Sequence, residues 1–495
     1  MTPVYKGILC CLILTLRCLP LSASEPATYR QRVEARISAF QFTHAQALIP
    51  LIPNRGYQAF YQSHILAYKY LATQDPAWLA ELRSQWSEAL RSVESIPASD
   101  PARTGFLADL YCKRAAAEFM AENYLTAIRL AKTGYGYLQQ TPPQRPEALK
   151  LRGLFHVLFG AVPSRYQWLT QMLGFEGDVA TGIGLLEQAQ ASGATLRMEA
   201  VVLLFYTQRN LLSDPQAALD RLDAEVRAHG PSFPLDYLRA SALLSLRRTD
   251  EALSMLRRKP SYLSEQVFWS PYWDYLQGKA QYFRNDWGEA RSSLEEFTRT
   301  CKGSLFLTDA IFRLGMAALF TGQQAEAREW LARIARERPG GFDEDAYAAA
   351  TAWQFLQAPP SQATLDLFRA RNYFDGGYFD RARETFGQIE TRRALLSPAE
   401  AAELQYRYGR LEHLCSRYAQ ARQRYQAALE IPLTGPVRYV QAYSLFYLGE
   451  LERDAGNRAA ARLHFEQALR MDQYHYQSGL ESKIKPALAA LRSKS

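Results

Sequence analysis

Helical periodicity dominates the chain from Glu25 to its end. Apolar residues recur at the spacing of an amphipathic helix, and Gly, Pro, Asn or Asp interrupts them roughly every 15 to 20 residues. Alternation of the strand type is almost absent. The pattern therefore predicts helical hairpins in series, an all-α architecture in which neighbouring hairpins stack on one another.

One spacing recurs within this helical pattern. A small residue is followed by Ala twelve positions later and by a large apolar residue four positions after that. Clear copies are Ala370/Ala382/Phe386, Gly409/Ala421/Tyr425 and Gly449/Ala461/Phe465, further copies are Gly278/Ala290/Leu294 and Gly315/Ala327/Leu331, and weaker ones are Ala240/Ala252/Leu256 and Ala115/Ala127/Ala131. Small residues let two helices approach closely, and we expect the large residue to pack on the next pair. Gly322, Gly377 and Gly456 fall at the predicted turn between the paired helices, where a residue without a β-carbon relaxes the backbone.

This spacing resembles that of the tetratricopeptide repeat, in which two antiparallel helices per repeat stack on their neighbours. The resemblance implies a right-handed superhelical solenoid that works as a binding surface rather than as a site for chemistry. We expect four segments: a signal peptide at 1–24, N-terminal helical repeats at 25–150, an apolar helical insert with degenerate repeats at 151–258, and a C-terminal tetratricopeptide repeat array at 259–495.

The first 24 residues have the layout of a secretory signal peptide. Lys6 precedes an apolar run, and small residues end the segment near Ser24. The run is shorter than the roughly 20 residues of a membrane span. We therefore expect export, to the periplasm or out of the cell. Lipid attachment at Cys18 is the disfavoured alternative, because Arg17 stands where a small residue is expected.

Composition and motifs argue against several classes of function. The net charge is +8, and removal of Lys6 and Arg17 with the signal leaves +6, without a Lys/Arg block of the kind that binds nucleic acid. Cys112, Cys301 and Cys415 are isolated, and no two histidines have the helical spacing of metal ligands. Nucleophile, zinc-protease, phosphate-loop and dinucleotide motifs are absent from the sequence. We expect neither an enzyme nor a cofactor, a metal or a nucleic-acid partner.

Residues 151–191 differ from the repeats around them. A very apolar helix runs to Gly160, a turn occupies 174–178, and Gly182 and Gly184 enter a further helix. A helix with so few polar positions is expected to be buried on most of its circumference. A peripheral membrane contact through residues 151–173 is the alternative.

Two groups of carboxylates carry their own interpretations. Asp178 and Glu187 would be the acid and base groups of an enzyme if one deep cleft also held His156. The acids of residues 343–345 instead fit the solvated N-terminus of a helix, where negative charge favours the helix dipole.

Two further segments resemble a particular family. The run from Val162 through 174–178 to Glu187, and the ending from Tyr474 to Lys483, resemble the tetratricopeptide repeat protein 39 family and its fungal outer-mitochondrial-membrane relatives. The resemblance implies an all-helical, non-enzymatic adaptor, linked in eukaryotes to lipid handling and protein-aggregate clearance. Those relatives act in the cytosol, whereas this chain carries an export signal. The expectation is an exported bacterial homologue.

The remaining candidate for function is the groove. In such repeats the first helix of each pair lines the concave face, and positions one turn apart meet the ligand. In the repeat frame these positions hold Tyr272, Tyr275, Lys279, Tyr282, Arg371, Arg410, His413 and Arg453. Tyrosines beside arginines suit an extended peptide, through stacking and bidentate contacts to carboxylates. The main hypothesis is an exported scaffold that binds a protein or extended peptide, and the alternative is a glycan-binding module of outer-membrane nutrient uptake.

Overall fold

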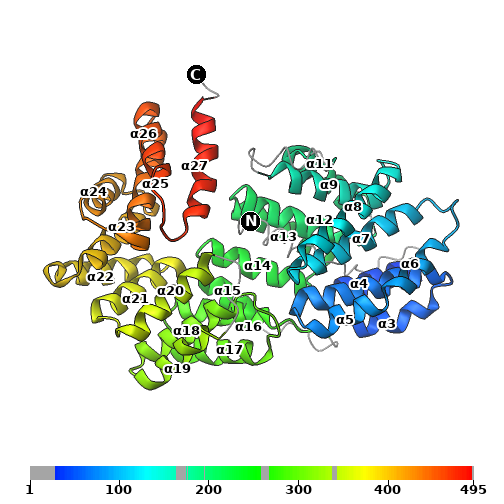
Figure 1. The fold of residues 1–495 in the computed structure, drawn as a ribbon, viewed down its shortest axis with the longest axis horizontal. Helices are drawn as coiled ribbons and strands as arrows, with labels where there is room; N and C mark the ends of the chain where they lie inside the picture. The colour runs from blue at the N-terminus through cyan, green and yellow to red at the C-terminus, as the bar shows by residue number, and fades with distance from the viewer. Residues whose placement is uncertain are drawn as a thin grey trace.

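The computed structural model describes residues 28–162, 174, 177–193, 195–257, 267–336 and 343–492. Its regular structure in these ranges is helical, without a strand, which confirms the all-α prediction (Figure 1). The first third contains α2 (Tyr29–Ser38), α3 (Phe42–Leu48), η1 (Ile49–Leu51), α4 (Arg55–Thr73), α5 (Pro76–Ser84), α6 (Trp86–Glu94), α7 (Arg103–Met120), α8 (Tyr124–Gln140) and α9 (Pro146–Gly160). The middle contains α11 (Val179–Ala191), α12 (Met198–Tyr206), η3 (Thr207–Leu211), α13 (Pro215–His229), α14 (Phe233–Ser245), α15 (Thr249–Arg257), α16 (Tyr272–Phe283), α17 (Trp287–Thr300), α18 (Leu307–Phe320) and α19 (Gln324–Ile334). The last third contains α20 (Asp343–Gln357), α21 (Gln362–Gly376), α22 (Phe379–Glu390), η5 (Arg393–Leu395), α23 (Pro398–Leu414), α24 (Tyr418–Leu429), η6 (Gly435–Arg438), α25 (Tyr439–Asp454), α26 (Arg458–Leu469) and α27 (Gln477–Arg492).

Seven helical hairpins follow the repeat frame: α7–α8, α14–α15, α16–α17, α18–α19, α21–α22, α23–α24 and α25–α26. In each, the residue seven positions after the small residue has a positive φ: Glu122, Arg247, Asn285, Gly322, Gly377, Ser416 and Gly456. The next amide N–H then donates back to a carbonyl five residues earlier, as from Tyr378 to Tyr373 at 2.8 Å and from Asn457 to Glu452 at 2.8 Å. The two weaker copies of the spacing are therefore repeats of the same kind.

The spacing works through close contact within a hairpin. A β-carbon added at Gly449 would lie 2.5 Å from the Phe465 ring, and one at Gly409 would lie 2.8 Å from the Tyr425 ring. The large residue also reaches the next pair, because the Tyr425 ring stacks on Tyr447 of α25 with centroids 5.7 Å apart. These contacts confirm the expected packing of the large residue on the next pair of helices. The small residue leaves room for the same large side chain within its own hairpin.

Prolines begin several helices rather than only ending them. Pro76, Pro146, Pro215 and Pro398 each occupy the first helical position, where the missing N–H would have no partner in the helix. Ser397 caps α23 by accepting from the Glu400 backbone N–H, and the Glu400 carboxylate accepts from the Ser397 N–H.

The stacking order departs from a simple array at α20. This helix packs on α18 and α19 without a hairpin partner of its own, and α21 packs back on α16. Asn372 of α21 donates to the side chain of Asn285 at 2.9 Å, and Asn285 donates to the Arg369 carbonyl at 3.3 Å. The chain thus doubles back and brings α21 beside the middle repeats.

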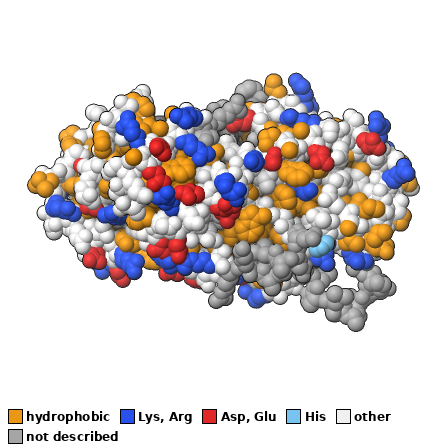
Figure 2. Space-filling model, turned by 90° about the horizontal axis from the view of Figure 1, so that it is seen from below, with side chains coloured by type: hydrophobic (Ala, Val, Ile, Leu, Met, Phe, Trp, Pro, Cys, Tyr) orange, Lys and Arg blue, Asp and Glu red, His pale blue; other side chains and the backbone are white. Residues whose placement is uncertain are grey.

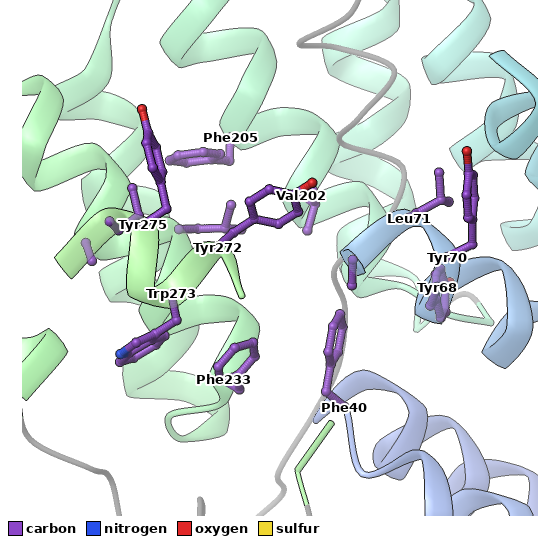
Figure 3. Packing of buried hydrophobic residues seen from close by; sticks show 14 of the residues in the cluster. Phe40, Tyr68, Tyr70, Leu71, Val202, Phe205, Phe233, Tyr272, Trp273 and Tyr275 are labelled. Carbon is purple, nitrogen blue, oxygen red and sulfur yellow. The ribbon is translucent and has the colours of Figure 1, made fainter. Parts of the chain in front are cut away.

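The N-terminal helices also close onto the middle of the chain. The Phe268 N–H donates to the Phe40 carbonyl at 2.7 Å, and the Ser270 hydroxyl donates to the Ala72 carbonyl at 2.8 Å. Around these contacts Phe233 stacks on Trp273 with centroids 5.2 Å apart (Figure 3). One hydrophobic core therefore runs from Val33 to Leu365, across the predicted boundaries at 150 and 258.

A buried ionic network lies inside the N-terminal half. The Lys113 ammonium contacts Asp109 at 2.9 Å and Glu199 at 2.8 Å, and the Lys150 ammonium contacts the same two carboxylates at 2.7 and 2.6 Å. The Tyr68 hydroxyl also donates to Glu199. Burial alone would raise the pKa of Asp109, but the two ammonium groups lower it well below its usual range. The network links α4, α7 and α9 to α12, and its members are too far apart in sequence for any motif to predict it.

The apolar 151–173 segment is described only in part. Leu151, Leu154 and Phe155 of α9 are buried, and α9 packs against α11. Residues 163–173 lie outside the described ranges. Among the helices described, none is long and apolar enough to cross a membrane. Peripheral membrane contact remains a prediction.

Candidate functional site

A cavity of about 450 Å³ lies where the N-terminal helices, the middle repeats and α21 meet. It is bounded by the end of α4, by η3, α14, α16 and α18, and by single residues of α20 and α21. Its apolar lining is largely aromatic: Tyr206, Phe233, Tyr237, Tyr272, Tyr275, Phe283 and Phe306. We call it the central cavity.

Three predicted site residues, Tyr272, Tyr275 and Lys279, line the central cavity from consecutive turns of α16. Figure 3 shows the two tyrosines among the packed aromatic side chains of this region. Both rings are buried, with 5% and 2% of their surface exposed. Tyr275 stacks on Phe306 with centroids 4.6 Å apart. Its hydroxyl donates to Asp309 at 2.8 Å. Burial and the Asp309 carboxylate raise the pKa of Tyr275, so the phenol is neutral and acts as a donor.

The acidic end of the central cavity is mostly occupied by internal pairing. Asp309 accepts from the Arg313 guanidinium at 2.6 and 3.0 Å, and it is buried. Asp345 accepts from the Asp309 backbone N–H at 3.3 Å. Asp345 is 1% exposed, which corrects the expectation of a solvated helix terminus for this residue. Asp345 is buried because α20 packs directly on α18.

The basic end of the central cavity carries Arg209 and Arg247, which the repeat frame did not select. Arg209 lies on η3, a π-helical turn that extends α12, and its Nε donates to the Ser245 hydroxyl at 2.9 Å. Arg247 lies at the left-handed turn after α14, with its guanidinium 4.8 Å from the Phe374 ring centroid. π-Helical turns are rare in proteins, but they often occur at functional sites. No pattern in the sequence predicts the one at η3.

A smaller hollow of about 60 Å³ holds the next two predicted residues, Tyr282 and Arg371. Tyr282 is 2% exposed and lies under the Arg313 guanidinium at 4.8 Å. The Arg371 guanidinium lies 3.5 Å from Asp375 and 5.3 Å from the Tyr347 ring centroid. Asp375 lines both spaces, so the smaller hollow adjoins the central cavity.

Arg410 and His413 lie one turn apart on α23. The Arg410 guanidinium is 4.1 Å from the Tyr447 ring centroid and donates to the Tyr406 hydroxyl at 3.3 Å. The Nδ1 of His413 is 3.2 Å from the Tyr425 hydroxyl. Burial, followed by the charge of Arg410, lowers the pKa of His413, so its imidazole is neutral near pH 7. These residues form an aromatic and cationic surface next to the α21 side of the site.

Arg453, like Arg410 and His413, is a predicted site residue outside the lining of both spaces. It lies at the end of α25, where it pairs with Glu450 at 2.5 Å and with Asp454 at 2.8 Å. It lines neither the central cavity nor the smaller hollow.

The groups considered for chemistry have local structural roles. Asp178 caps α11 by accepting from the Thr181 N–H at 2.7 Å, and Glu187 pairs with Arg221 at 2.7 Å. In the described ranges no group of His, Cys, Asp and Glu is arranged to hold a metal ion. Within the described ranges Cys112, Cys301 and Cys415 form no disulfide. Cys112 is buried, and the other two are partly exposed.

Comparison with known proteins gives one match to a sequence family. The tetratricopeptide repeat family matches residues 275–342, which contain most of α16 and all of α17 to α19. The chain contains tetratricopeptide-type repeats. This confirms the coarser prediction from the small-Ala-large spacing and fits a scaffold that binds protein. A search of curated proteins gives no match.

Three solved structures are similar to this chain over most of its length, at low sequence identity. The hetero-tetramer Cut9–Hcn1 of the APC/C matches at 13% identity and a TM-score of 0.29, over 94% of this chain and 88% of that one. A monomeric mutant of IFIT1 with Gppp-AAAA matches at 15% identity and a TM-score of 0.28, over 95% of this chain and 100% of that one. Yeast Tom70 matches at 11% identity and a TM-score of 0.29, over 94% of this chain and 97% of that one.

Proposed function

We propose that this protein is a non-enzymatic, exported scaffold that binds an extended segment of a partner protein on its inner surface. The observation that carries the proposal is the central cavity. It opens between tetratricopeptide-type repeats and is lined by aromatic rings, and the smaller hollow adjoins it through Asp375. Aromatic and arginine side chains supply most of the binding energy at protein interfaces.

The charges around these two spaces favour an acidic partner. Five basic residues line the central cavity or the smaller hollow: Arg209, Arg247, Lys279, Arg313 and Arg371. The acidic residues in the same linings are Asp309, Asp345 and Asp375. The linings of the two spaces together therefore have two more basic than acidic groups. The face shown in Figure 2 has no such bias, because basic and acidic side chains are interspersed on it.

The test is binding of the chain without residues 1–24 to a positional-scanning peptide array, with maltooligosaccharides as glycan probes. We expect a subset of acidic, extended peptides to bind at one site. Lys279→Glu should weaken that binding because Lys279 lines the central cavity, whereas Arg299→Glu on the exposed face of α17 should not. Binding of the oligosaccharides alone would favour the glycan module, and equal effects of the two substitutions would place binding elsewhere.

The exported location has its own test. Mass spectrometry of the protein purified from its native host should give a mature N-terminus close to Glu25. An unprocessed Met1, or a lipid-modified Cys18, would overturn the proposed processing.

A further inference from the structure

Arg247 is a partly buried cation whose acidic neighbour, Asp375, acts on it without a direct ion pair. It forms no ion pair with a carboxylate among the residues that the structure describes, and its Nε is buried without a hydrogen-bond partner. Burial lowers the pKa of Arg247, the Asp375 carboxylate opposes that shift in part, and the positive charge of Arg410 adds to it. An arginine in this state costs folding free energy, since a desolvated charge needs compensation.

Arg209 approaches the same end of α14 from another element. Its Nε donates to Ser245, which lies two residues before Arg247 and itself donates to the Ser241 carbonyl at 3.1 Å. Across the described ranges Arg209 forms no ion pair either. Its planar guanidinium keeps its remaining N–H donors for another acceptor. Two arginines therefore line one end of the central cavity.

Within the described ranges, the carboxylates of the central cavity form no direct ion pair with these arginines, and Asp375 acts on Arg247 only through space. Asp309 is held by Arg313 at 2.6 Å, and Asp375 by Arg371 at 3.5 Å. Asp345 is turned toward the Asp309 backbone N–H. The two arginines therefore keep donors for a ligand, and a planar guanidinium matches a carboxylate in geometry as well as in charge.

We infer that Arg209 and Arg247 form a carboxylate-binding subsite, in which an acidic side chain or the chain-terminal carboxylate of the partner segment is held while an adjacent apolar side chain enters the aromatic part of the central cavity. This inference rests on the proposed function and names the anchor by which the segment is recognised. A volume of about 450 Å³ accommodates a side chain and its carboxylate neighbour.

Arg247→Gly is the sharpest variant. Arg247 has φ of 59°, and Gly occupies the same turn in three other repeats, so the substitution suits the backbone. It also removes a poorly compensated charge. A residue with a structural role would lose stability, whereas we expect the free energy of unfolding of Arg247→Gly to stay equal or rise while binding falls. Arg209→Gln, with Arg299→Gln as the exposed control, tests the second arginine.

The probes are acetylated Phe-Asp-Phe peptides with a free carboxylate end or an amidated end, and their Phe-Asn-Phe counterparts, measured by calorimetry. Peptides with a carboxylate should bind the unmodified chain, and each arginine substitution should lower their affinity about tenfold to a hundredfold. The neutral, amidated Phe-Asn-Phe peptide should bind weakly and equally to all variants. Comparing the amidated Asp peptide with the free-acid Asn peptide shows which carboxylate is the source.

Three outcomes would overturn the inference. If peptides from the array bind but both arginine variants leave the affinity unchanged, the carboxylate subsite is wrong while the proposed function stands. If inorganic phosphate binds in an arginine-dependent way and the carboxylate peptides do not, the ligand chemistry is wrong. If neither the array nor these probes bind, the proposed function falls together with the inference.

Discussion

At the scale of single residues, the left-handed turn position has two kinds of occupant. Gly377 and Gly456 both have φ near 85°, which L side chains rarely adopt. They differ in their surroundings. A β-carbon at Gly456 would meet open space, whereas one at Gly377 would overlap the Arg247 carbonyl oxygen. The contact places the α21–α22 turn directly against the turn that carries Arg247.

The first prediction compares these two glycines. Gly456→Ala should lower the free energy of unfolding by about 1 to 2 kcal/mol, the cost of a left-handed alanine. Gly377→Ala should cost about 1 to 3 kcal/mol more, because the Arg247 turn must also shift. Chemical denaturation of both variants measures the difference. Equal losses would mean that the two turns can separate without cost.

At the scale of elements, the helices of the N-terminal half are joined by charge as well as by apolar packing. Lys150 of α9 and Lys113 of α7 share the carboxylates of Asp109 and Glu199, and all four side chains are buried. Two positive and two negative groups balance, so removal of one leaves a buried charge without compensation.

The second prediction removes one ammonium group from this network. Lys150→Met should destabilise the protein by about 3 to 5 kcal/mol, since Asp109 and Glu199 would then share only Lys113. Lys132→Met on the exposed face of α8 is the matched control and should stay within about 0.5 kcal/mol. The measurement is the midpoint and slope of urea unfolding. A loss as small as that of the control would show that water or another group replaces the missing charge.

At the scale of the whole molecule, the apolar core is not continuous. Among the described residues the largest cluster spans Val33 to Leu365, and a separate, smaller cluster spans Ala402 to Leu491 in α23 to α27. Two still smaller clusters lie in α7 to α9 and in α21 to α23. Repeat arrays gain much of their stability from contacts between neighbours, and a terminal unit has a neighbour on one side only. The Phe40–Phe268 contact closes the first cluster, whereas the C-terminal helices contact α20 through the Tyr347 ring, whose centroid lies 5.5 Å from that of His475 and 5.4 Å from that of Tyr476.

The third prediction concerns hydrogen exchange under native conditions. Amides of α23 to α26 should exchange through an opening of lower free energy than those of α4, α7 and α16, because their core is smaller and terminal. Mass spectrometry of peptic fragments would resolve the two groups. Exchange of all these helices at one common rate would show that the molecule opens as a single cooperative unit.

The sequence by itself determined the repeating unit of this protein. The small residue, the Ala twelve positions later and the large residue beyond it are local features, and their contacts form within one hairpin and with the next. The left-handed turn falls at a fixed offset for the same reason. Helical periodicity and turn chemistry depend on neighbours in the chain, so a pattern of residues is enough to predict them.

Only the tertiary structure decided where a ligand could bind. The central cavity combines Ala72, Arg209, Arg247, Lys279 and Asp345, which come from five separate helices or turns. They meet because α4 closes onto the middle repeats and because α21 packs back on α16. Such contacts join residues far apart in the chain and depend on the crossing of whole helices, which no local period encodes. For that reason the repeat frame found Lys279 but missed both arginines.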